Sequence, residues 1–422
     1  MTVPQKAGKY TKILLYLVVG GYALLFLVGL IPQQAVTRHV QVSATQLYEE
    51  GYSPVLLVRS DDSYRLDNFS EARILLSSMY LNSRDTLQAF LINPTYEADN
   101  DPIGTINDVA DSEEMPEPDT YFTHAILGFR ALVRPLLVFL NLRQIRRLLM
   151  WLTLLLFTAN VLSIRRHSSV LMSFLFAAAF LSVNPLIIMS SIQYSICFLI
   201  ALTAMLLMPE IGKWKSVTEP MVFFIIGGVT QYLDLNTYPL ITFGLPIIIR
   251  LLVKQRQGEL LTFKADLLFT AKCLLAWAAA FFGTWLIKLG VTTAFTDFNA
   301  FTDGMNALAD GLGLTGGGQP LLALKNSITY LVTIECGLCL VGFIVAWPFM
   351  MDTLRRRKVG YRQGRIFLLI ALLPVVWIVA ESRSSMQFAY YQYRMLIVTI
   401  FAGLCFYAKP TQYLEKNMNK PI

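Results

Sequence analysis

Long apolar runs recur along nearly the whole chain of 422 residues, separated by short polar loops. A helix needs roughly 20 apolar residues to cross the hydrocarbon of a bilayer. Composition points the same way, because 55% of the residues are hydrophobic and only 15% are charged, whereas soluble domains have about 25% charged residues. This pattern indicates a polytopic membrane protein and excludes a water-soluble enzyme, a disordered chain and a fibrous chain.

We predict an all-α integral-membrane domain over residues 1–422 with about ten transmembrane helices. The expected spans are 12–31, 147–164, 168–184, 194–208, 220–236, 239–253, 266–290, 327–351, 365–381 and 393–408. The first run is long enough for a full span and is not followed by a small-residue cleavage pattern. We therefore expect it to be retained as a membrane anchor and not removed as a signal peptide.

Basic residues gather in alternate loops between these spans. Those loops include Arg165, Lys213, Arg256 and the run 355–358, and both ends of the chain are also basic. The positive-inside rule places such segments in the cytoplasm. We expect a multi-pass protein of the cell membrane, in contact with the lipid bilayer, with both termini cytoplasmic. The net charge of +7 is then a topology signal and does not indicate a nucleic-acid partner.

Two long segments are then expected on the outer side of the membrane, residues 32–146 and 291–326. The first contains more than half of the 28 acidic residues of the chain. The second contains a run of three glycines at 316–318, which lacks the Lys and Ser/Thr of a phosphate-binding loop and indicates flexibility. The acidic segment and the glycine run are therefore both expected outside the membrane.

The first outer segment is expected to be partly helical. A capping residue at Asn68 or Ser70 and apolar residues at helical spacing predict a short helix over 66–83. The many Asp, Glu, Pro and Asn residues of 93–120 predict an exposed, irregular stretch. Apolar and basic residues alternate over 121–146, as in an amphipathic helix lying in the membrane interface.

The basic residues at the end of this segment are expected to act as membrane anchors. Arg143, Arg146 and Arg147 are expected to extend to the lipid headgroups, as long basic side chains do at membrane surfaces. The cysteines are expected to be small buried hydrophobes, since all lie within apolar runs. They are Cys197, Cys273, Cys336, Cys339 and Cys405. Cys336 and Cys339 form a CxxC pair, but no second CxxC accompanies it. The outer acidic residues show no tight ligand spacing either, so neither a metal nor another cofactor is expected.

Polar and ionisable residues gather at the outer ends of several spans, where their proximity to hydrocarbon is costly and often functional. They include Asp234, Arg383, Gln387, Tyr391 and Arg394. Each residue alone could be an interfacial anchor. Because all are expected on one side, beneath a folded acidic segment, together they indicate a cavity that opens to the exterior.

This arrangement resembles the GT-C class of membrane glycosyltransferases. The class has a retained first span, a large first outer loop with an early acidic residue, an interfacial helix pair and a bundle of spans. The stretches that carry the resemblance are 66–69 (LDNF), 121–135, 223–246 and 384–394. It covers most of the chain as an architecture, with loose motifs, and relatives are expected to have a histidine near Gln387.

The resemblance implies an inverting glycosyltransferase of a bacterial cell envelope. Its donor would be a sugar linked to a polyprenyl phosphate, and its acceptor a surface glycan such as a cell-wall polysaccharide, or a glycolipid. The acceptor hydroxyl needs a base, for which Asp67 is the first candidate and Glu71, Asp61 and Asp62 are the alternatives. Asp67 could instead be only a helix cap.

The departing lipid phosphate needs fixed cations, and the planar fork of arginine suits phosphate oxygens. Arg394 and Arg134 are the candidates for this role, with His124 or Arg383 assisting. Asp234, Gln387 and Tyr391 are expected to line the substrate cavity.

Two other function classes fit the same sequence. One is a transporter or flippase of lipid-linked sugars, although such folds commonly have two repeats and this sequence shows no clear internal repeat. The other is a non-catalytic subunit of a polysaccharide assembly complex, in which the acidic segment would be a docking surface. An Asp67→Asn protein that remains active would favour either alternative over the enzyme.

Overall fold

The computed structural model describes residues 3–56, 62–82, 86–96, 101–112, 116–214, 217–259, 262–332 and 360–418. Helices make up most of this part of the chain. Its only sheet is a two-stranded antiparallel ribbon of β1 (Pro94–Thr95) and β2 (Thr120–Tyr121), in which Pro94 pairs with Tyr121. The prediction of an all-α chain is therefore confirmed for these residues.

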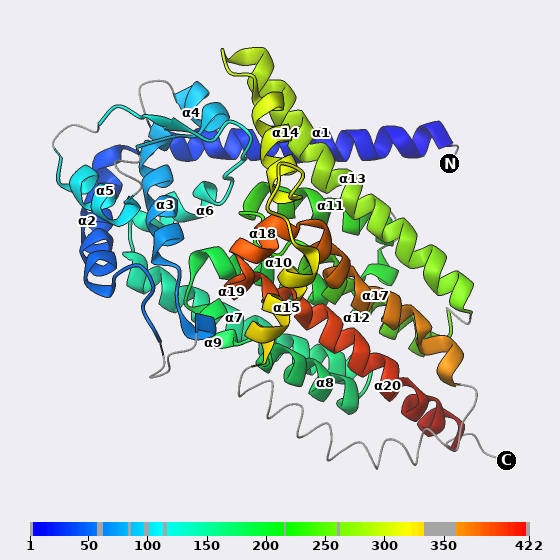
Figure 1. Cartoon of the computed structure of the whole chain (residues 1–422). Coiled ribbons are helices and arrows are strands. Elements are labelled where there is room, and N and C mark those ends of the chain that lie inside the picture. Colours follow the sequence, from blue (N-terminus) through cyan, green and yellow to red (C-terminus); the bar gives the residue numbers. More distant parts are fainter. Residues whose placement is uncertain are drawn as a thin grey trace.

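The N-terminal helices form one group beside the rest of the molecule. They are α1 (Val3–Gly29), α2 (Gln33–Glu50), α3 (Asn68–Met79), α4 (Thr86–Ile92), α5 (Pro102–Asp111) and α6 (Arg130–Leu137). Figure 1 shows α2 to α6 gathered at one end of α1. The apolar faces of α2, α3, α5 and α6 share one core, to which α7 and α10 also contribute. The segment that we predict to be outer, called the outer unit below, is therefore folded and not a linker.

The second group is a helical bundle with a larger core (Figure 1). Its helices are α7 (Leu142–His167), α8 (Val170–Leu181), α9 (Pro185–Met189), α10 (Ile192–Leu207), α11 (Glu219–Leu233), α12 (Ile241–Gln257), α13 (Phe263–Phe295), α17 (Gly360–Ala380) and α20 (Ile397–Met418). Shorter helices lie at one end of this bundle: α14 (Ala300–Gly311), α15 (Pro320–Leu331), α18 (Ser382–Gln387) and α19 (Ala389–Gln392).

Three helices of the described chain are long and apolar enough to cross a membrane. They are the part of α1 over Gly8–Gly29, α7 and α13, with 22, 26 and 33 residues. Three shorter helices are also apolar: α8, α10 and the Gly364–Ala380 part of α17. Membrane association is thus indicated by length and composition, whereas the full set of ten spans is not established.

Several predicted spans correspond to helices that are shorter than a bilayer requires. The run 220–236 becomes α11 with 15 residues, and the run 239–253 becomes α12 with 17 residues. At 1.5 Å per residue such helices are about 23–26 Å long, less than the hydrocarbon thickness of about 30 Å. The predicted span 327–351 lies mostly outside the described residues, since α15 ends at Leu331.

The prediction of an exposed, irregular stretch at 93–120 is wrong for its middle part, and residues 97–100 and 113–115 lie outside the described residues. Residues 102–111 form α5, which begins with Pro102 and is capped by Asp101, whose carboxylate accepts a hydrogen bond from the Gly104 N–H at 2.8 Å. Ile103 and Ile106 lie on its buried face against α2 and α3. The proline-plus-cap signal and this helical spacing outweigh the polar composition of the region.

The expected interfacial helix over 121–146 is also wrong in its extent and in the direction of its arginines. The segment contains α6, and α7 already begins at Leu142. Arg130 and Arg134 are fully buried. Both guanidinium groups donate to protein oxygens, Arg130 to Asn93 and Arg134 to the Ile31 carbonyl at 2.7 Å. Because buried backbone carbonyls need donors, these arginines serve the fold and do not extend to lipid headgroups.

Cys197, Cys273 and Cys405 are buried, as the sequence predicts. Cys336 and Cys339 fall outside the described residues. Among the residues that are described, no three His, Cys, Asp or Glu side chains are grouped as metal ligands would be.

Candidate functional site

A cavity of about 770 Å³ lies between the outer helical unit and the segment that follows α17. One wall comes from α3 and the other from α18 and α19, with α10 contributing Gln193. The polar residues that line it are Tyr52, Ser53, Asp67, Ser70, Arg73, Ser77, Thr95, Gln193, Gln387, Tyr390 and Tyr391. The cavity therefore joins segments that are more than 300 positions apart in the sequence.

One face of α3 supplies the chemical groups of the first wall. Asp67, Ser70, Ile74 and Ser77 recur every three or four positions, so they share one side of the helix. The helix forms here because Asp67 caps its first turn, accepting a hydrogen bond from the Ser70 N–H at 3.0 Å. The prediction of a helix at 66–83 is confirmed, although its cap is Asp67 and not Asn68 or Ser70.

Asp67 both caps α3 and lines the cavity. One carboxylate oxygen accepts from the Ser70 hydroxyl at 2.8 Å and from the Tyr390 hydroxyl at 2.9 Å. The side chain also borders a smaller cavity of about 240 Å³ that contains Arg65 and Tyr330. A carboxylate can accept about four hydrogen bonds. Asp67 accepts three here, so it can accept one more from the hydroxyl group of a ligand.

Gln193 provides a second polar group in this cavity. Its side chain is buried, and its amide oxygen has no hydrogen-bond partner among the described residues. A buried polar atom without a partner costs free energy. A ligand with a hydroxyl or amide donor would satisfy it, and this is independent support for a polar ligand in the cavity.

Glu71, an alternative candidate for the base, does not line the cavity. It is fully buried, and one carboxylate oxygen accepts from the Ser191 hydroxyl at 2.6 Å and the Ile192 N–H at 2.8 Å. These donors form the first turn of α10, where a carboxylate is favoured by the helix dipole. Burial raises the pKa of Glu71, and Arg146 and these hydrogen bonds oppose that shift. Glu71 thus fastens α3 to α10. Asp61 and the side chain of Asp62 lie outside the described residues.

Arg146 corrects another expectation, because it is buried and not at the lipid surface. Its guanidinium donates to Glu50 at 2.8 Å and to the Asn68 side chain at 2.7 Å, and lies 3.9 Å from Glu71. This buried network, which comprises Glu50, Asn68, Glu71 and Arg146, joins α2, α3 and α7. It fixes the first turn of α3, and therefore Asp67, against the bundle. Arg143 and Arg147 are exposed.

The two arginines predicted to hold phosphate do not line this cavity. Arg394 is buried in η5 (Tyr393–Leu396), donates to the Ser63 carbonyl at 3.1 Å and the Tyr390 carbonyl at 3.2 Å, and lies over the Tyr194 ring. It therefore positions Tyr390, the partner of Asp67. Arg134 donates to carbonyl groups of the outer unit, including Met79 at 3.1 Å.

Arg73 is the cation that does line the cavity, and the sequence-based analysis missed it. Its guanidinium lies 4.5 Å from the centre of the Phe69 ring and 5.9 Å from that of Phe122. Such stacking holds the planar group in place. Its spacing from Asp67 gave no signal, because six residues at about 100° each place the two side chains about 120° apart around the helix.

His124 and Arg383 hold the second outer segment in place. His124 Nδ1 lies 2.8 Å from Asp303 of α14, and Arg383 contacts Asp310 and the Thr315 hydroxyl. Asp303 also accepts from the Thr123 hydroxyl at 2.5 Å. Burial raises the pKa of Asp303, but the Thr123 and His124 hydrogen bonds outweigh this effect and lower it overall. These contacts anchor α14 at both ends.

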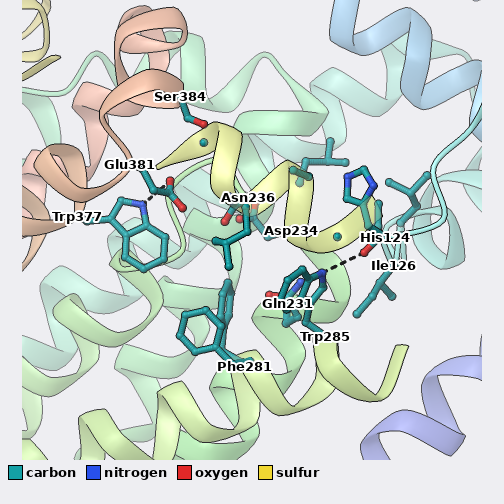
Figure 2. A pocket seen from close by; sticks show the side chains of 18 residues that line it. His124, Ile126, Gln231, Asp234, Asn236, Phe281, Trp285, Trp377, Glu381 and Ser384 are labelled. Atoms are coloured by element: carbon teal, nitrogen blue, oxygen red, sulfur yellow. Dashed lines mark hydrogen bonds between the residues drawn. The ribbon is translucent and has the colours of Figure 1, made fainter. Parts of the chain in front are cut away.

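A second cavity of about 250 Å³ lies beneath α14 (Figure 2). It contains His124 and Asp234, whereas Gln387 and Tyr391 line the first cavity. Ala125, Leu127 and Leu235 border both cavities. The predicted substrate residues are therefore divided between two adjoining spaces.

The wall between the two cavities is fixed by a close backbone contact. The Gly128 N–H donates to the Tyr232 carbonyl at 3.0 Å. A Cβ atom on Gly128 would lie 2.2 Å from that oxygen, so only glycine allows this approach. The preceding Leu127 has a φ of 50°, an unusual value for leucine. Strain of this kind often accompanies functional sites.

Comparison of the chain with family models, curated proteins and solved structures gives no match.

Proposed function

We propose that this protein is an inverting glycosyltransferase that moves a sugar from a polyprenyl-phosphate donor to a surface glycan or glycolipid. The observation that carries the proposal is the position of Asp67. Its carboxylate borders both the cavity of about 770 Å³ and the smaller one of about 240 Å³, and it accepts a hydrogen bond from Tyr390. A cation, Arg73, and the unsatisfied amide oxygen of Gln193 line the same space.

The proposed reaction is a single displacement at the anomeric carbon. An acceptor hydroxyl attacks this carbon and forms the new glycosidic bond, while its proton passes to the Asp67 carboxylate. The bond between the anomeric carbon and the phosphate oxygen breaks, and the bonding electrons leave with the lipid phosphate. General-base assistance by a positioned carboxylate contributes about 10²–10⁴-fold in rate.

The charge on the departing phosphate would be stabilised by Arg73. Arginine suits this task because its planar fork binds phosphate oxygens in pairs. The stacking of Arg73 between Phe69 and Phe122 supports a preorganised guanidinium. Arg394 then has a positioning role, through its hydrogen bond to the Tyr390 carbonyl.

The proposal includes a location. We place the Asp67 cavity and the cavity beneath α14 on the outer side of a bacterial cell membrane. The chain would have ten spans, with both termini cytoplasmic. The long apolar helices α1, α7 and α13 support membrane insertion, and the alternation of basic loops supports this orientation.

Asp67→Asn in purified protein, assayed with a radiolabelled polyprenyl-phosphate sugar, tests the proposal. Asparagine keeps a capping oxygen for α3, so we expect normal expression with a loss of transfer of about 10²-fold or more. Asp108→Asn, an exposed change in the same outer unit, is the matched control and should be silent. Full activity of Asp67→Asn would contradict the enzyme and favour a transporter or an assembly subunit.

A further inference from the structure

The second cavity, beneath α14, has two aromatic walls. Trp285 and Phe281 come from α13, and Trp377 comes from the last turn of α17 (Figure 2). Each indole ring is fixed by its N–H group. Trp285 donates to the His124 carbonyl at 3.1 Å, and Trp377 donates to Glu381 at 2.9 Å. Fixed aromatic faces provide flat surfaces on which the C–H groups of a ligand can pack.

Between these walls lies a ring of hydrogen-bonding groups. Gln231, Asp234, Asn236, Glu381 and Ser384 line the cavity, and Figure 2 shows Asp234, Asn236 and Glu381 between the tryptophans. Carboxylates, amides and a hydroxyl together can both donate and accept hydrogen bonds. Alternating apolar walls and convergent polar groups are typical of small-molecule sites.

The charge of the cavity limits what can enter. No lysine or arginine is among the described residues that line it, and two carboxyl groups are. His124 also lines the cavity, but its ring nitrogen lies 2.8 Å from Asp303 and is engaged there. An anionic ligand would therefore meet two carboxyl groups and would be disfavoured by like-charge repulsion.

Helix α14 covers the cavity and lies close to it because of two glycines. A Cβ atom on Gly304 would lie 2.9 Å from Leu289, and one on Gly311 would lie 2.9 Å from the Ser384 hydroxyl. The helix is held by Asp303 against Thr123 and His124, and by Asp310 against Arg383. One side of the cavity is therefore bounded by a helix that is fastened near both of its ends.

We infer that this second cavity binds one uncharged pyranose ring. A pyranose has apolar C–H faces for Trp285 and Trp377 and a rim of hydroxyls for Asp234, Asn236 and Glu381. At about 250 Å³ the space suits a single ring and not a longer oligosaccharide. Its role as the site of the acceptor's terminal sugar rests on the proposed function, because Ala125, Leu127 and Leu235 connect it to the Asp67 cavity.

The test uses the full-length protein in nanodiscs with its six tryptophans replaced by 5-fluorotryptophan. Trp285→Phe and Trp377→Phe variants identify these two ¹⁹F resonances. Glucose, galactose, N-acetylglucosamine and glucuronate are then titrated at millimolar concentrations. We expect at least one uncharged sugar to shift both resonances and glucuronate to shift neither. No shift with any of the uncharged sugars, or an equal shift with glucuronate, would overturn the inference.

A blocking variant on the covering helix provides the matched control. Ala307 lines the cavity and Asn306 does not, and both are exposed residues of α14. Ala307→Phe should abolish the sugar-induced shift, whereas Asn306→Phe should retain it. Equal shifts in the two variants would place the sugar elsewhere and overturn the inference.

The two proposals fail separately. Asp67→Asn should still show the sugar-induced shifts while it loses transfer. If transfer depends on Asp67 but the shifts are absent, the second cavity is not a sugar site and the proposed reaction stands. If the shifts are present but Asp67→Asn remains active, the sugar site stands and the reaction does not.

Discussion

The carboxylate of Asp67 accepts hydrogen bonds from Ser70 in its own helix turn and from Tyr390, which lies 323 positions later in the chain. The first contact is local and follows from helix-capping chemistry. The second depends on how α19 packs against η1 (Asp62–Tyr64), which precedes α3 in the chain. The possible roles of Asp67 as a helix cap and as a cavity residue are therefore compatible.

Arg73 and Arg394 should respond differently to replacement by lysine. Arg73→Lys keeps a positive charge in the cavity but loses the paired donors that suit phosphate. We expect a higher donor concentration for half-maximal transfer, with acceptor dependence unchanged. Arg394→Lys should chiefly lower thermal stability, because its guanidinium bridges the Ser63 and Tyr390 carbonyls.

Arg147→Lys is the control for these two variants, since Arg147 is exposed on the surface of α7. It should change neither the donor requirement nor the stability. If Arg73→Lys shows unchanged donor kinetics, Arg73 is not the phosphate ligand. Arg65, which lines the adjoining smaller cavity, would then be the next candidate.

At the scale of elements, the buried network of Glu50, Asn68, Glu71 and Arg146 joins helices that the sequence places far apart. Arg146→Ala leaves the Glu71 carboxylate buried without its cation and Glu50 without its closest one. Breaking a buried pair in this way is strongly destabilising. We expect the free energy of unfolding to fall by about 3 kcal/mol.

Arg147→Ala, one position along the same helix, is the matched control and should change stability little. Thermal unfolding of both variants would measure the difference. Equal effects would show that the network contributes less than its burial implies. Because Asn68 follows Asp67 directly, loss of the network should also reduce transfer activity.

The helices of the outer unit show which sequence patterns predict structure correctly. The helix at 66–83 has a cap and closely spaced apolar residues, and it forms as α3. In α2, Val36, Val40, Ala44 and Leu47 are buried at helical spacing, and this pattern was present in the sequence but was overlooked. In α5, the acidic and proline-rich composition obscured a regular helical start. Periodicity and capping were better guides here than composition.

For the molecule as a whole, the orientation across the membrane remains a prediction. Single cysteines at Asp111 in the outer unit and at Lys213 after α10 test it, both positions being exposed. In a background without the five native cysteines, an impermeant maleimide added to intact cells should label position 111 and not 213. The reverse pattern would place both cavities in the cytoplasm and contradict the proposed function.

Local spacing and composition were enough to predict the helical class, the helix at Asp67 and the burial of Cys197, Cys273 and Cys405. It also pointed to Asp67, Gln387 and Tyr391, which line one cavity. It did not reveal that Arg134 and Arg394 face protein carbonyls while Arg73 faces the cavity.

The partners of these arginines follow from tertiary packing. An arginine has the same local sequence signal whether its partner is a phosphate, a lipid headgroup or a distant carbonyl. The partner depends on which segments pack together. Arg134 lies 103 positions from its partner Ile31 in the sequence, and Arg394 lies 331 positions from its partner Ser63. Only the fold could place these groups, because most buried donors and acceptors find a partner, however distant in the chain.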